Sequence, residues 1–330
     1  YDSAIFLASQ LCEKYPKSNT CLDVFRKAYL AFYESDRREE FFSFLEALEH
    51  FIPLPIKRDL VCSACIPKEV IDVIIPVHNG WSLLKRCFDS VRTLSGPCLG
   101  RIILVNDCSD YATRLKLKHL VDTEENVVLI ETSKQSGFSR ALALGLNEST
   151  STTFVALNSD TLVTEGWLDR LYTRLRSAKL VAMVGPLSNS AGWQNYGPVL
   201  SAKKGFASSA IPTAQLRADL NEEIIKKDYC IQVHMLHGFC VLVDRKIYNN
   251  HGGLDQILFP EGYGEFQDLS IRMRESGHVL LLAADCLVFH EKGGSISSSR
   301  RAFLSMAGRK ALYEKYSTIN YLCLEMASIQ

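Results

Sequence analysis

The stretch "VIDVIIPVHNG" (residues 70–80) decides the fold class, because its run of β-branched residues ends in turn-forming polar ones. Three similar runs follow, and segments with apolar residues at helical spacing alternate with them. The runs are "GRIILVND" (100–107), "NVVLIET" (126–132) and "TTFVALNSD" (152–160), and the helix-like segments lie at 82–94, 111–122, 138–149 and 166–177. This alternation predicts a Rossmann-like α/β fold, with a mainly parallel sheet covered by helices on both faces.

The composition of the 330-residue chain argues against two kinds of partner. Its 37 basic and 37 acidic residues cancel, so we expect no nucleic-acid partner. No apolar run approaches the roughly 18–20 residues that span a bilayer, and we find no signal peptide. The sequence begins at Tyr1 rather than Met, which leaves open that it is a fragment and that an anchor lies beyond its ends.

The eleven cysteines favour a reducing compartment. Their number is odd, and they are scattered through expected strands and helices, as buried free thiols are. We therefore expect a cytoplasmic protein, either free or peripheral at the inner face of the membrane. The pair Cys62 and Cys65 has zinc-knuckle spacing, but no second pair or nearby histidine completes four ligands, so these are interpreted as linker thiols.

The N-terminal part of the chain differs from the rest. Residues 1–56 carry three amphipathic helical patterns and predict a small all-helical appendage. Residues 57–69 end a proline-containing stretch and are interpreted as a linker.

Polar residues at the strand ends are the candidate site, because ligands of such sheets lie beyond the carboxyl ends of the strands. Gly137 precedes a helix-like segment with Arg140 in its first turn, where a phosphate could meet amide groups and a cation. There are plain alternatives for individual residues. An Asx turn at a strand end would explain Asn79 or Asp107 alone, and Arg140 could be a solvated helix arginine. The strand-end residues are Pro76, His78, Asn79, Asp107, Asn158, Ser159 and Asp160.

Five motifs carry a resemblance to a known family. They are "DVIIPVHNGWSLLKRCFDSV" (72–91), "IILVNDCSD" (102–110), "SGFSRALALG" (136–145), "FVALNSDTLVTEGWLDRL" (154–171), and "GYGEFQDLSIR" (262–272) with "VFHEKGGS" (288–295). In order and spacing they resemble family 2 nucleotide-sugar glycosyltransferases, and most of all the bacterial surface-polysaccharide branch with its rhamnosyltransferase-like members. The resemblance implies a GT-A fold over residues 70–298, with a nucleotide-sugar half (70–165) and an acceptor half (166–298). Residues 299–330 are then a C-terminal helical tail.

The resemblance also implies a divalent cation, Mg²⁺ or Mn²⁺, which would neutralise the leaving diphosphate. Asp160 matches the last acid of the family's DxD motif, and His290 matches its late histidine ligand. Asn158 stands where the first acid is usual and adds no charge. A turn-capping acid and a strand-end histidine are the alternatives.

On the donor side, the resemblance assigns Asp107 to the nucleotide base or ribose. Pro76, His78 and Asn79 would shape the loop beside the base, and Arg140 would contact the pyrophosphate. The donor is expected to be a UDP- or dTDP-sugar.

The catalytic base is expected in "GYGEFQDLS", where relatives commonly carry a Glu-Asp pair and use its second acid. Phe266 stands at that second position, so we assign the role to Glu265 and keep Asp268 as the alternative. Asp268 could instead orient Arg272, which lies four residues further along the helix.

Three residues are expected on the acceptor side, namely Trp167, His237 and Gly238. Trp167 could stack on a sugar ring or belong to the core. The activity implied is metal-dependent, inverting transfer of a sugar to a hydroxyl of a growing or lipid-linked glycan or surface polysaccharide. The alternative is a catalytically degenerate module that serves as a binding or scaffold domain of a larger glycosyltransferase. The chain lacks the N-terminal loop of nucleotidyltransferases and the G-x-G-x-x-G of dehydrogenases, which disfavours both.

Overall fold

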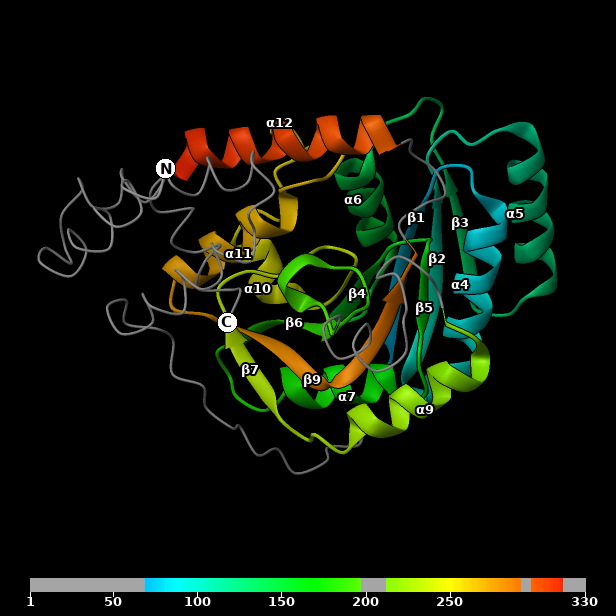
Figure 1. Ribbon diagram of the computed structural model, residues 1–330. Coiled ribbons are helices and arrows are strands. Elements are labelled where there is room, and N and C mark those ends of the chain that lie inside the picture. Colours follow the sequence, from blue (N-terminus) through cyan, green and yellow to red (C-terminus); the bar gives the residue numbers. More distant parts are fainter. Residues whose placement is uncertain (1–68, 197–211, 292–297, 317–330) are drawn as a thin grey trace, which may run out of the picture. The chain divides into compact units, whose positions relative to one another are not determined.

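The computed structural model describes residues 69–196, 212–291 and 298–316 (Figure 1). The predicted appendage (1–56), the Cys62–Cys65 pair and all but the last residue of the predicted linker lie outside the described residues. The chain forms two compact units, one of residues 57–311 and one of residues 1–56 with 312–330. The account below concerns the first unit.

Strands and helices alternate through the first part of this unit, as the sequence pattern predicts. In chain order they are β1 (Ile71–Val77), α4 (Trp81–Leu94), η1 (Gly96–Cys98), β2 (Leu99–Asn106), α5 (Tyr111–Thr123), β3 (Val127–Glu131), α6 (Phe138–Glu148), β4 (Thr153–Leu157), β5 (Thr161–Val163) and α7 (Trp167–Leu175).

The later elements include more strands than the sequence pattern alone indicated. They are β6 (Val181–Leu187), η2 (Gly192–Gln194), α9 (Ala214–Ile225), β7 (Cys230–Val233), β8 (Cys240–Asp244), α10 (Arg245–Asn250), α11 (Glu265–Glu275), β9 (Val279–His290) and α12 (Ser298–Tyr316).

The strands form one mixed sheet in the order β3-β2-β1-β4-β8-β6-β9-β5, with β7 paired to β9. β1 runs parallel to β2 and β4, and β2 runs parallel to β3, as expected for a series of strand–helix–strand units. β8 is antiparallel to both β4 and β6. The predicted α/β class is therefore confirmed, with antiparallel pairings confined to the part of the sheet beyond β4.

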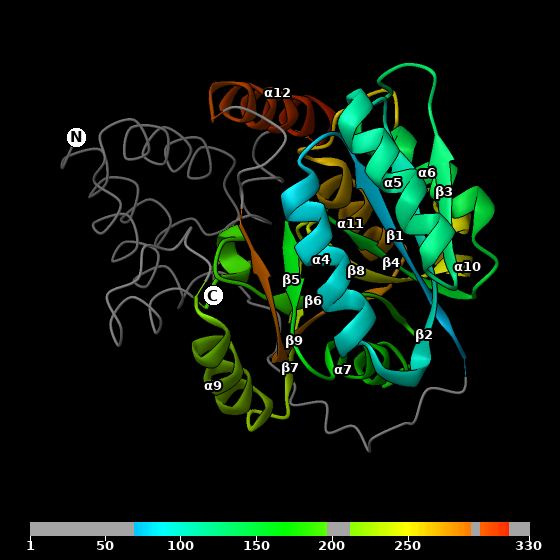
Figure 2. The same cartoon turned by 90° about the vertical axis from the view of Figure 1, so that its right-hand side faces the viewer.

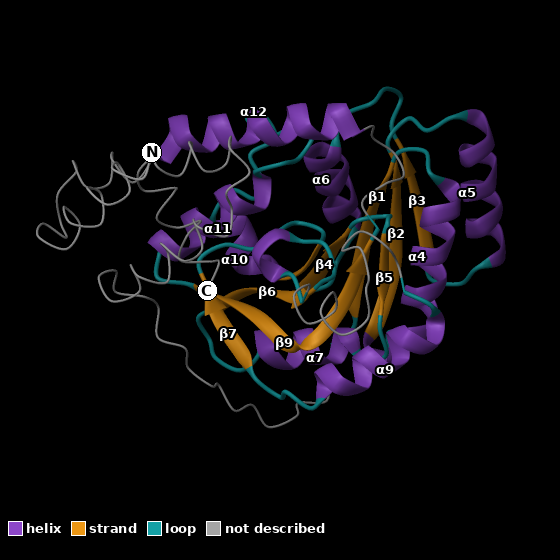
Figure 3. Cartoon of the chain, viewed as in Figure 1, coloured by secondary structure: helices purple, strands orange, loops and turns teal. Residues whose placement is uncertain are grey.

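Helices cover both faces of the sheet (Figure 3), and each face has its own apolar core. Side chains of α4, α5 and α7 pack on one face, and side chains of α6, α9, α10 and α11 pack on the other. In Figure 2, α4 and α5 stand in front of β1 and β2. A strand covered on both faces needs apolar side chains on both, which is why β1 is a nearly continuous apolar run.

Gly145 shows how closely α6 lies against the sheet. A Cβ built on this glycine would overlap the Ile74 side chain of β1 and crowd Val105 of β2. Any larger residue would therefore push α6 outward and move the segments at its two ends.

The long strand β9 contains a bulge that lets it serve two sets of neighbours. Its register with β6 jumps from Pro186↔Ala283 to Leu187↔Leu287, and its last residues pair with β5. Asp285 lies within this bulge and accepts a hydrogen bond of 2.9 Å from the buried Arg174 of α7. The bulge thus redirects β9 towards β5, as bulges commonly do near functional sites.

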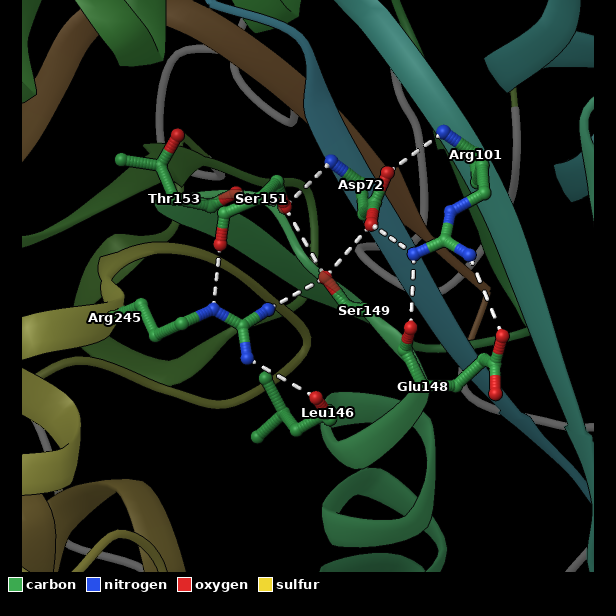
Figure 4. Close-up of polar contacts among 8 residues, drawn as sticks. All are labelled: Asp72, Arg101, Leu146, Glu148, Ser149, Ser151, Thr153 and Arg245. Carbon is green, nitrogen blue, oxygen red and sulfur yellow. Dashed lines mark hydrogen bonds and ion pairs between the residues drawn. The ribbon is translucent and has the colours of Figure 1, made fainter.

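A buried polar network joins the amino-terminal ends of β1 and β4 (Figure 4). Asp72 accepts hydrogen bonds from the Arg101 amide (2.8 Å), the Arg101 guanidinium (3.2 Å) and the Ser149 hydroxyl (2.7 Å). Arg245 donates to the same hydroxyl (2.5 Å) and to the Ser151 carbonyl (2.5 Å). Burial by itself would raise the pKa of Asp72, but the donors and the charge of Arg101 outweigh burial and lower it.

We predict that Asp72→Asn lowers the free energy of unfolding at pH 7 by about 1–3 kcal/mol, because it weakens the hydrogen bonds of a buried carboxylate. A carboxyl with a lowered folded-state pKa stabilises the fold above its unfolded pKa of about 3.9, and this stabilisation is lost as pH falls. The difference between variant and wild type should therefore shrink towards pH 3 in urea unfolding. The control is Asp89→Asn, which removes an exposed pair with Lys85 and should change stability by less than about 0.5 kcal/mol. Equal effects of the two variants at pH 7 would contradict the prediction.

Candidate active site

Two residues that are far apart in the sequence meet where β5 pairs with the end of β9. The antiparallel register places Thr161 opposite His290, and the amide of Glu291 donates to the Asp160 carbonyl at 2.9 Å. This pairing brings the side chains of the two residues into contact, with His290 Nε2 at 3.2 Å from Asp160 Oδ1. The sheet therefore brings the two predicted metal ligands together.

The His290 ring is held with Nε2 towards Asp160. Its Nδ1 lies 3.2 Å from the Ser190 carbonyl oxygen, which can only accept, so a proton on Nδ1 would satisfy that oxygen and would leave the Nε2 lone pair directed towards the Asp160 side. The ring stacks on Phe239 with centroids 5.3 Å apart, and the His290 amide donates to the Asn189 side chain at 2.7 Å. Such outer contacts fix the tautomer and orientation of metal-binding histidines.

This pair fits a divalent cation. Adjacent ligands of an octahedral ion with bonds of about 2.1 Å lie about 3 Å apart, close to the observed 3.2 Å separation of the two side chains. Among the described residues no cluster of three or more His, Cys, Asp or Glu could hold a metal. Asp160 and His290 would therefore leave most positions on the ion to phosphate oxygens and water, as Mg²⁺ sites commonly do.

Asn158 and Ser159 precede Asp160 at the tip of β4 and are partly exposed. The Asn158 amide donates to the Phe239 carbonyl at 2.9 Å, and its own carbonyl accepts from the Thr161 hydroxyl at 2.8 Å. The backbone of this tip is thus fixed while its side chains stay partly accessible.

The ends of β1 and β2 are tied together on the predicted nucleotide side. His78 Nδ1 donates to the Asp107 carbonyl at 2.8 Å, and Asn79, at a φ of 59°, accepts from the Asp110 amide at 2.8 Å. Pro76 lies in β1 opposite Val105 and is partly buried. His78 and Asn79 thus form a loop at the end of β1 that is bonded to the end of β2, and its contact with a nucleotide base stays a prediction.

Asp107 differs from the prediction that it contacts the nucleotide. Its side chain is 4% exposed, and its carboxylate accepts from the Ser136 amide (2.7 Å), the Ser136 hydroxyl (2.7 Å) and the Gly137 amide (2.8 Å). The Thr132 hydroxyl adds a fourth donor at 3.1 Å. A buried carboxylate with four donors holds the segment before α6 in place and has little access to a ligand.

The start of α6 is likewise occupied by protein atoms, which corrects the prediction of a phosphate site at Gly137. Gly137 has a φ of +88°, and a Cβ there would overlap the Pro260 carbonyl oxygen. That oxygen accepts from the Ser139 amide at 3.2 Å. Arg140 is exposed in the same helical turn, and its contact with a pyrophosphate stays a prediction.

Glu265, the first residue of α11, is an almost fully buried carboxyl. It is 6% exposed, and its Oε2 accepts from the Gly264 amide at 3.0 Å. Burial raises its pKa to about 7, the charge of Asp268 adds to this effect, and hydrogen bonds from the Gly264 and Glu265 amides oppose it. A carboxyl with such a pKa can accept a proton near neutral pH, as a general base must.

Asp268 has a different role, because its carboxylate pairs with an arginine. It is fully buried and accepts from Arg272 Nε at 2.8 Å and Nη2 at 2.7 Å. Arg272 also donates to the Gly253 carbonyl at 2.6 Å and to the His251 carbonyl. Asp268 therefore orients Arg272 and ties α11 to the turn after α10, which was the alternative considered for it. This pairing with Arg272 argues against Asp268 as the catalytic base.

Phe266, which stands where the resemblance implied an acid, belongs to the core. It is fully buried beside Leu269 and Met273 of the same helix. A Cβ built on Gly238 would overlap the Phe266 ring and lie 2.7 Å from Glu265 Oε1. Gly238 thus allows the start of α11 to approach the segment before β8.

The acceptor-side predictions have different outcomes. His237 lies beside α11, with its Nδ1 3.4 Å from Gln267 Nε2 and its amide donating to Gln194 Oε1 at 2.6 Å. Trp167 is wrong as an acceptor residue, because it is fully buried and its indole N–H donates to the Ser95 hydroxyl at 3.0 Å. It packs in the core between α7 and the sheet.

Two features of this region have only weak signals in the sequence. Asn189 and Ser190, which hold His290, lie in a polar, glycine-containing segment that is typical of a loop near a binding site. Tyr263 has a φ of 64° between two glycines and lies close enough to Asp160 and Glu265 for their charges to affect its pKa. The only sequence signal for Tyr263 is its position inside "GYGE".

Residues 72–252 match the family described as Glycosyl transferase family 2, and this range is more than half of the chain. The chain belongs to this family. Glu265 and His290 lie beyond the matched range, so their assignment depends on the geometry above.

Curated relatives include polypeptide N-acetylgalactosaminyltransferases. The human form 15 is 28% identical over 246 residues, which is 69% of this chain and 37% of that protein. The mouse form 4 is 33% identical over 127 residues, which is 38% of this chain and 22% of that protein. Glycosyltransferase GlyA of Streptococcus pneumoniae is 29% identical over 105 residues, which is 32% of this chain and 15% of that protein. The matches thus cover well under half the length of each of these relatives.

Two solved structures share the fold. GalNAc-T7 with UDP, GalNAc and Mn²⁺ superposes with a TM-score of 0.56 at 16% identity, covering 76% of this chain and 49% of that one. The mannosyltransferase PcManGT of Pyrobaculum calidifontis with GDP-Man and Mn²⁺ superposes with a TM-score of 0.57 at 14% identity. The superposition covers 93% of this chain and 81% of that one. The GT-A architecture implied by the sequence is confirmed, whereas the rhamnosyltransferase-like branch stays a prediction.

Within the described ranges, none of the helices is both long enough and apolar enough to cross a bilayer. Cys87, Cys240 and Cys286 are buried free thiols, whereas Cys108 is exposed, unlike the buried thiols that the cysteine pattern suggested.

We predict that Glu265→Gln stabilises the fold at pH 8. The folded-state pKa of about 7 lies above the ordinary value of 4.5, so ionising this buried carboxyl makes the folded state less stable as pH rises between the two values. The neutral amide avoids that cost and should raise the free energy of unfolding by up to about 3 kcal/mol at pH 8, with little effect at pH 4. Urea unfolding at both pH values measures this, and a variant that is less stable than wild type at pH 8 would contradict it.

Proposed function

We propose that the chain is a metal-dependent, inverting glycosyltransferase that moves a sugar from a nucleoside-diphosphate sugar to a hydroxyl. The observation that carries the proposal is the Asp160–His290 pair at 3.2 Å, which fits a divalent cation. Phe239 stacks on His290, and the preceding residue, Gly238, abuts the Glu265 carboxylate. The cation ligands and the candidate base are therefore linked through two consecutive residues.

In the proposed reaction, Glu265 accepts the proton of the acceptor hydroxyl as its oxygen attacks the anomeric carbon of the sugar. The bond from that carbon to the diphosphate breaks on the opposite side, and the nucleoside diphosphate leaves with the electron pair. When bound, Mg²⁺ or Mn²⁺ would neutralise the charge that grows on the diphosphate. Asp160 and His290 would hold the ion, and the partly exposed Asn158 and Ser159 precede Asp160 at the tip of β4.

The donor is proposed to be a UDP-sugar, with a dTDP-sugar as the second choice of base. The solved GalNAc-T7 structure contains UDP and Mn²⁺, and the mannosyltransferase structure contains GDP-Man and Mn²⁺. The proposed acceptor is a hydroxyl of a glycan or lipid-linked glycan, in the cytoplasm or at the inner face of the membrane. Because several relatives are polypeptide transferases, a serine- and threonine-rich peptide is the comparison acceptor.

The buried carboxyl of Glu265 supports an enzyme rather than the degenerate-module alternative, because it offers a candidate base next to Phe266, which belongs to the core. The chain covers only part of its curated relatives, and we propose that it works beside other domains of a larger glycosyltransferase.

We predict that Asp160→Ala and His290→Ala each lower Mn²⁺-dependent donor hydrolysis by about 100-fold or more, because each removes a ligand of the ion that faces the leaving group. The measurement is nucleoside-diphosphate release from UDP-GalNAc, UDP-glucose, dTDP-rhamnose and GDP-mannose, with Mn²⁺, Mg²⁺ or EDTA. Asp122→Ala, at an exposed position of α5, is the control and should keep wild-type rates. Full metal-dependent turnover by Asp160→Ala would contradict the cation site.

The pH dependence tests the base. Glu265 must be ionised to accept a proton, so kcat should rise with pH and level off above about 7, where burial places its pKa. Glu265→Gln should lose at least about 99% of the transfer activity, and its remaining activity should no longer rise with pH below about 7. If kcat of Glu265→Gln still rose with pH as it does in the wild type, the base would be another residue.

A further inference from the structure

The side-chain amide of Gln194 joins two segments that lie far apart in the chain. Gln194 is the last residue of η2 and is fully buried. Its Nε2 donates to the Pro186 carbonyl of β6 at 2.9 Å, and its Oε1 accepts from the His237 amide at 2.6 Å. Each end of the amide thus meets a partner of the opposite kind, so only this orientation of the side chain satisfies both partners.

The loop that carries Gln194, residues 188–196, is closed by its own backbone. The Ser188 amide donates to the Gln194 carbonyl at 2.8 Å, and the Tyr196 amide donates to the Ser188 carbonyl at 2.7 Å. Neither of these bonds involves the Gln194 side chain. The loop therefore keeps its shape without that side chain, which instead holds the segment at His237.

The segment 236–239 lies directly against the candidate base. A Cβ built on Gly238 would lie 2.7 Å from Glu265 Oε1, so the backbone of this segment covers the carboxyl, which is 6% exposed. Gln194 bonds the amide of His237, the residue immediately before Gly238. Loss of the Gln194 bond would therefore loosen the part of the chain that shields Glu265 from water.

The two ends of the same segment have anchors of their own. The Leu236 amide donates to the Ser270 hydroxyl of α11 at 3.2 Å, and the Phe239 carbonyl accepts from the Asn158 amide at 2.9 Å. These bonds stay when the Gln194 side chain is changed. We therefore expect a local displacement at Gly238 rather than detachment of the whole segment.

The loop 188–196 also contacts the candidate cation ligand, through a different side chain. Asn189 Oδ1 accepts from the His290 amide at 2.7 Å, and Asn189 Nδ2 donates to the His290 carbonyl at 3.3 Å. One loop therefore reaches the cation ligand through Asn189 and the cover of the candidate base through Gln194. Because two side chains carry the two contacts, each contact can be removed separately.

We propose that Gln194 is a positioning residue for sugar transfer, which holds His237 and Gly238 so that the Glu265 carboxyl stays buried. The inference rests on the proposed function, because that function assigns Glu265 the role of base. Gln194 itself touches neither donor nor acceptor, since it is fully buried and both ends of its amide are bonded within the protein. Its effect passes through the peptide unit that joins His237 to Gly238.

The test compares Gln194→Met with the wild-type full chain, because methionine matches glutamine in length but cannot make either hydrogen bond. The donor is the one that wild type hydrolyses fastest among UDP-GalNAc, UDP-glucose and GDP-mannose with Mn²⁺. We expect kcat to fall about tenfold or more, while KM for the donor changes less than about threefold.

The pH profile separates positioning from a merely structural role. Burial raises the pKa of Glu265 to about 7, and hydration of the carboxyl in Gln194→Met should move the midpoint of the rise of kcat to lower pH. The charge of Asp268 adds to the raised pKa and is present in both proteins, so the difference between them reports burial.

Two variants serve as matched controls. Asn221→Leu removes another buried amide, which donates to the Glu165 carbonyl at 3.3 Å, and should leave kcat and KM within about twofold of wild type. Asn189→Ala removes the contact of the same loop with His290 and should raise the Mn²⁺ concentration for half-maximal rate about tenfold. The pH midpoint should stay in place in Asn189→Ala, and the Mn²⁺ dependence should stay in place in Gln194→Met.

Urea unfolding tests the same contact without turnover. Glu265→Gln should stabilise the otherwise unchanged chain at pH 8, and this gain should fall by at least about half in the Gln194→Met background, since a hydrated carboxyl ionises more easily. The unfolding curve of Gln194→Met alone shows whether the variant is folded under the assay conditions.

The outcomes are distinguishable. An unchanged pH midpoint together with an unchanged gain from Glu265→Gln would overturn the inference, whatever the loss of kcat. A wild type that neither hydrolyses nor binds any of these donors would overturn the proposed function. In that case the unfolding comparison still decides whether Gln194 keeps Glu265 buried.

Discussion

The buried polar groups at the carboxyl edge of the sheet need hydrogen-bond partners where their strands end, and this requirement shapes the site. The partners come from distant segments, because neighbouring residues are already used in strands and helices. Asp107 bonds the segment before α6, and the Ser190 carbonyl accepts from His290. The Pro260 carbonyl accepts from the first turn of α6. The same bonds that satisfy the backbone place Asp160, His290 and Glu265 in one region.

Much of this could be predicted from the sequence. The alternation of β-branched runs with amphipathic segments was enough for the α/β class, because strand and helix periods differ clearly over such lengths. The resemblance to a known family was enough to expect Asp160 and His290 in one place, and β5 and β9 bring them together. The antiparallel pairing of the strands after β4 could not be predicted, because strands that pair in this part of the sheet lie far apart in the chain.

Individual side chains were less predictable, because a residue's partner can lie far away in the chain. Asp107 looks like a ligand-binding acid at a strand tip, yet its four donors lie 25 to 30 residues later. Trp167 could stack on a sugar or belong to the core, and its full burial together with the hydrogen bond to Ser95 shows that it belongs to the core. Glu265 and Asp268 share a helix turn, and the difference between them is the arginine four residues after the second acid. Local pattern therefore locates the site, while packing assigns the roles.

The bulge in β9 has a consequence for how sequences of this kind can vary in length. One strand pairs with β6 and β7 in the core and then with β5 beside Asp160, so its residue count sets the distance from core to site. Inserting or deleting one residue after the bulge would turn the His290 side chain to the opposite face of the sheet. A change of two residues would keep the face but displace the ring by about 6.6 Å, beyond the reach of Asp160. We expect changes of length to collect in the loops on either side of β9 and to be absent between its bulge and His290.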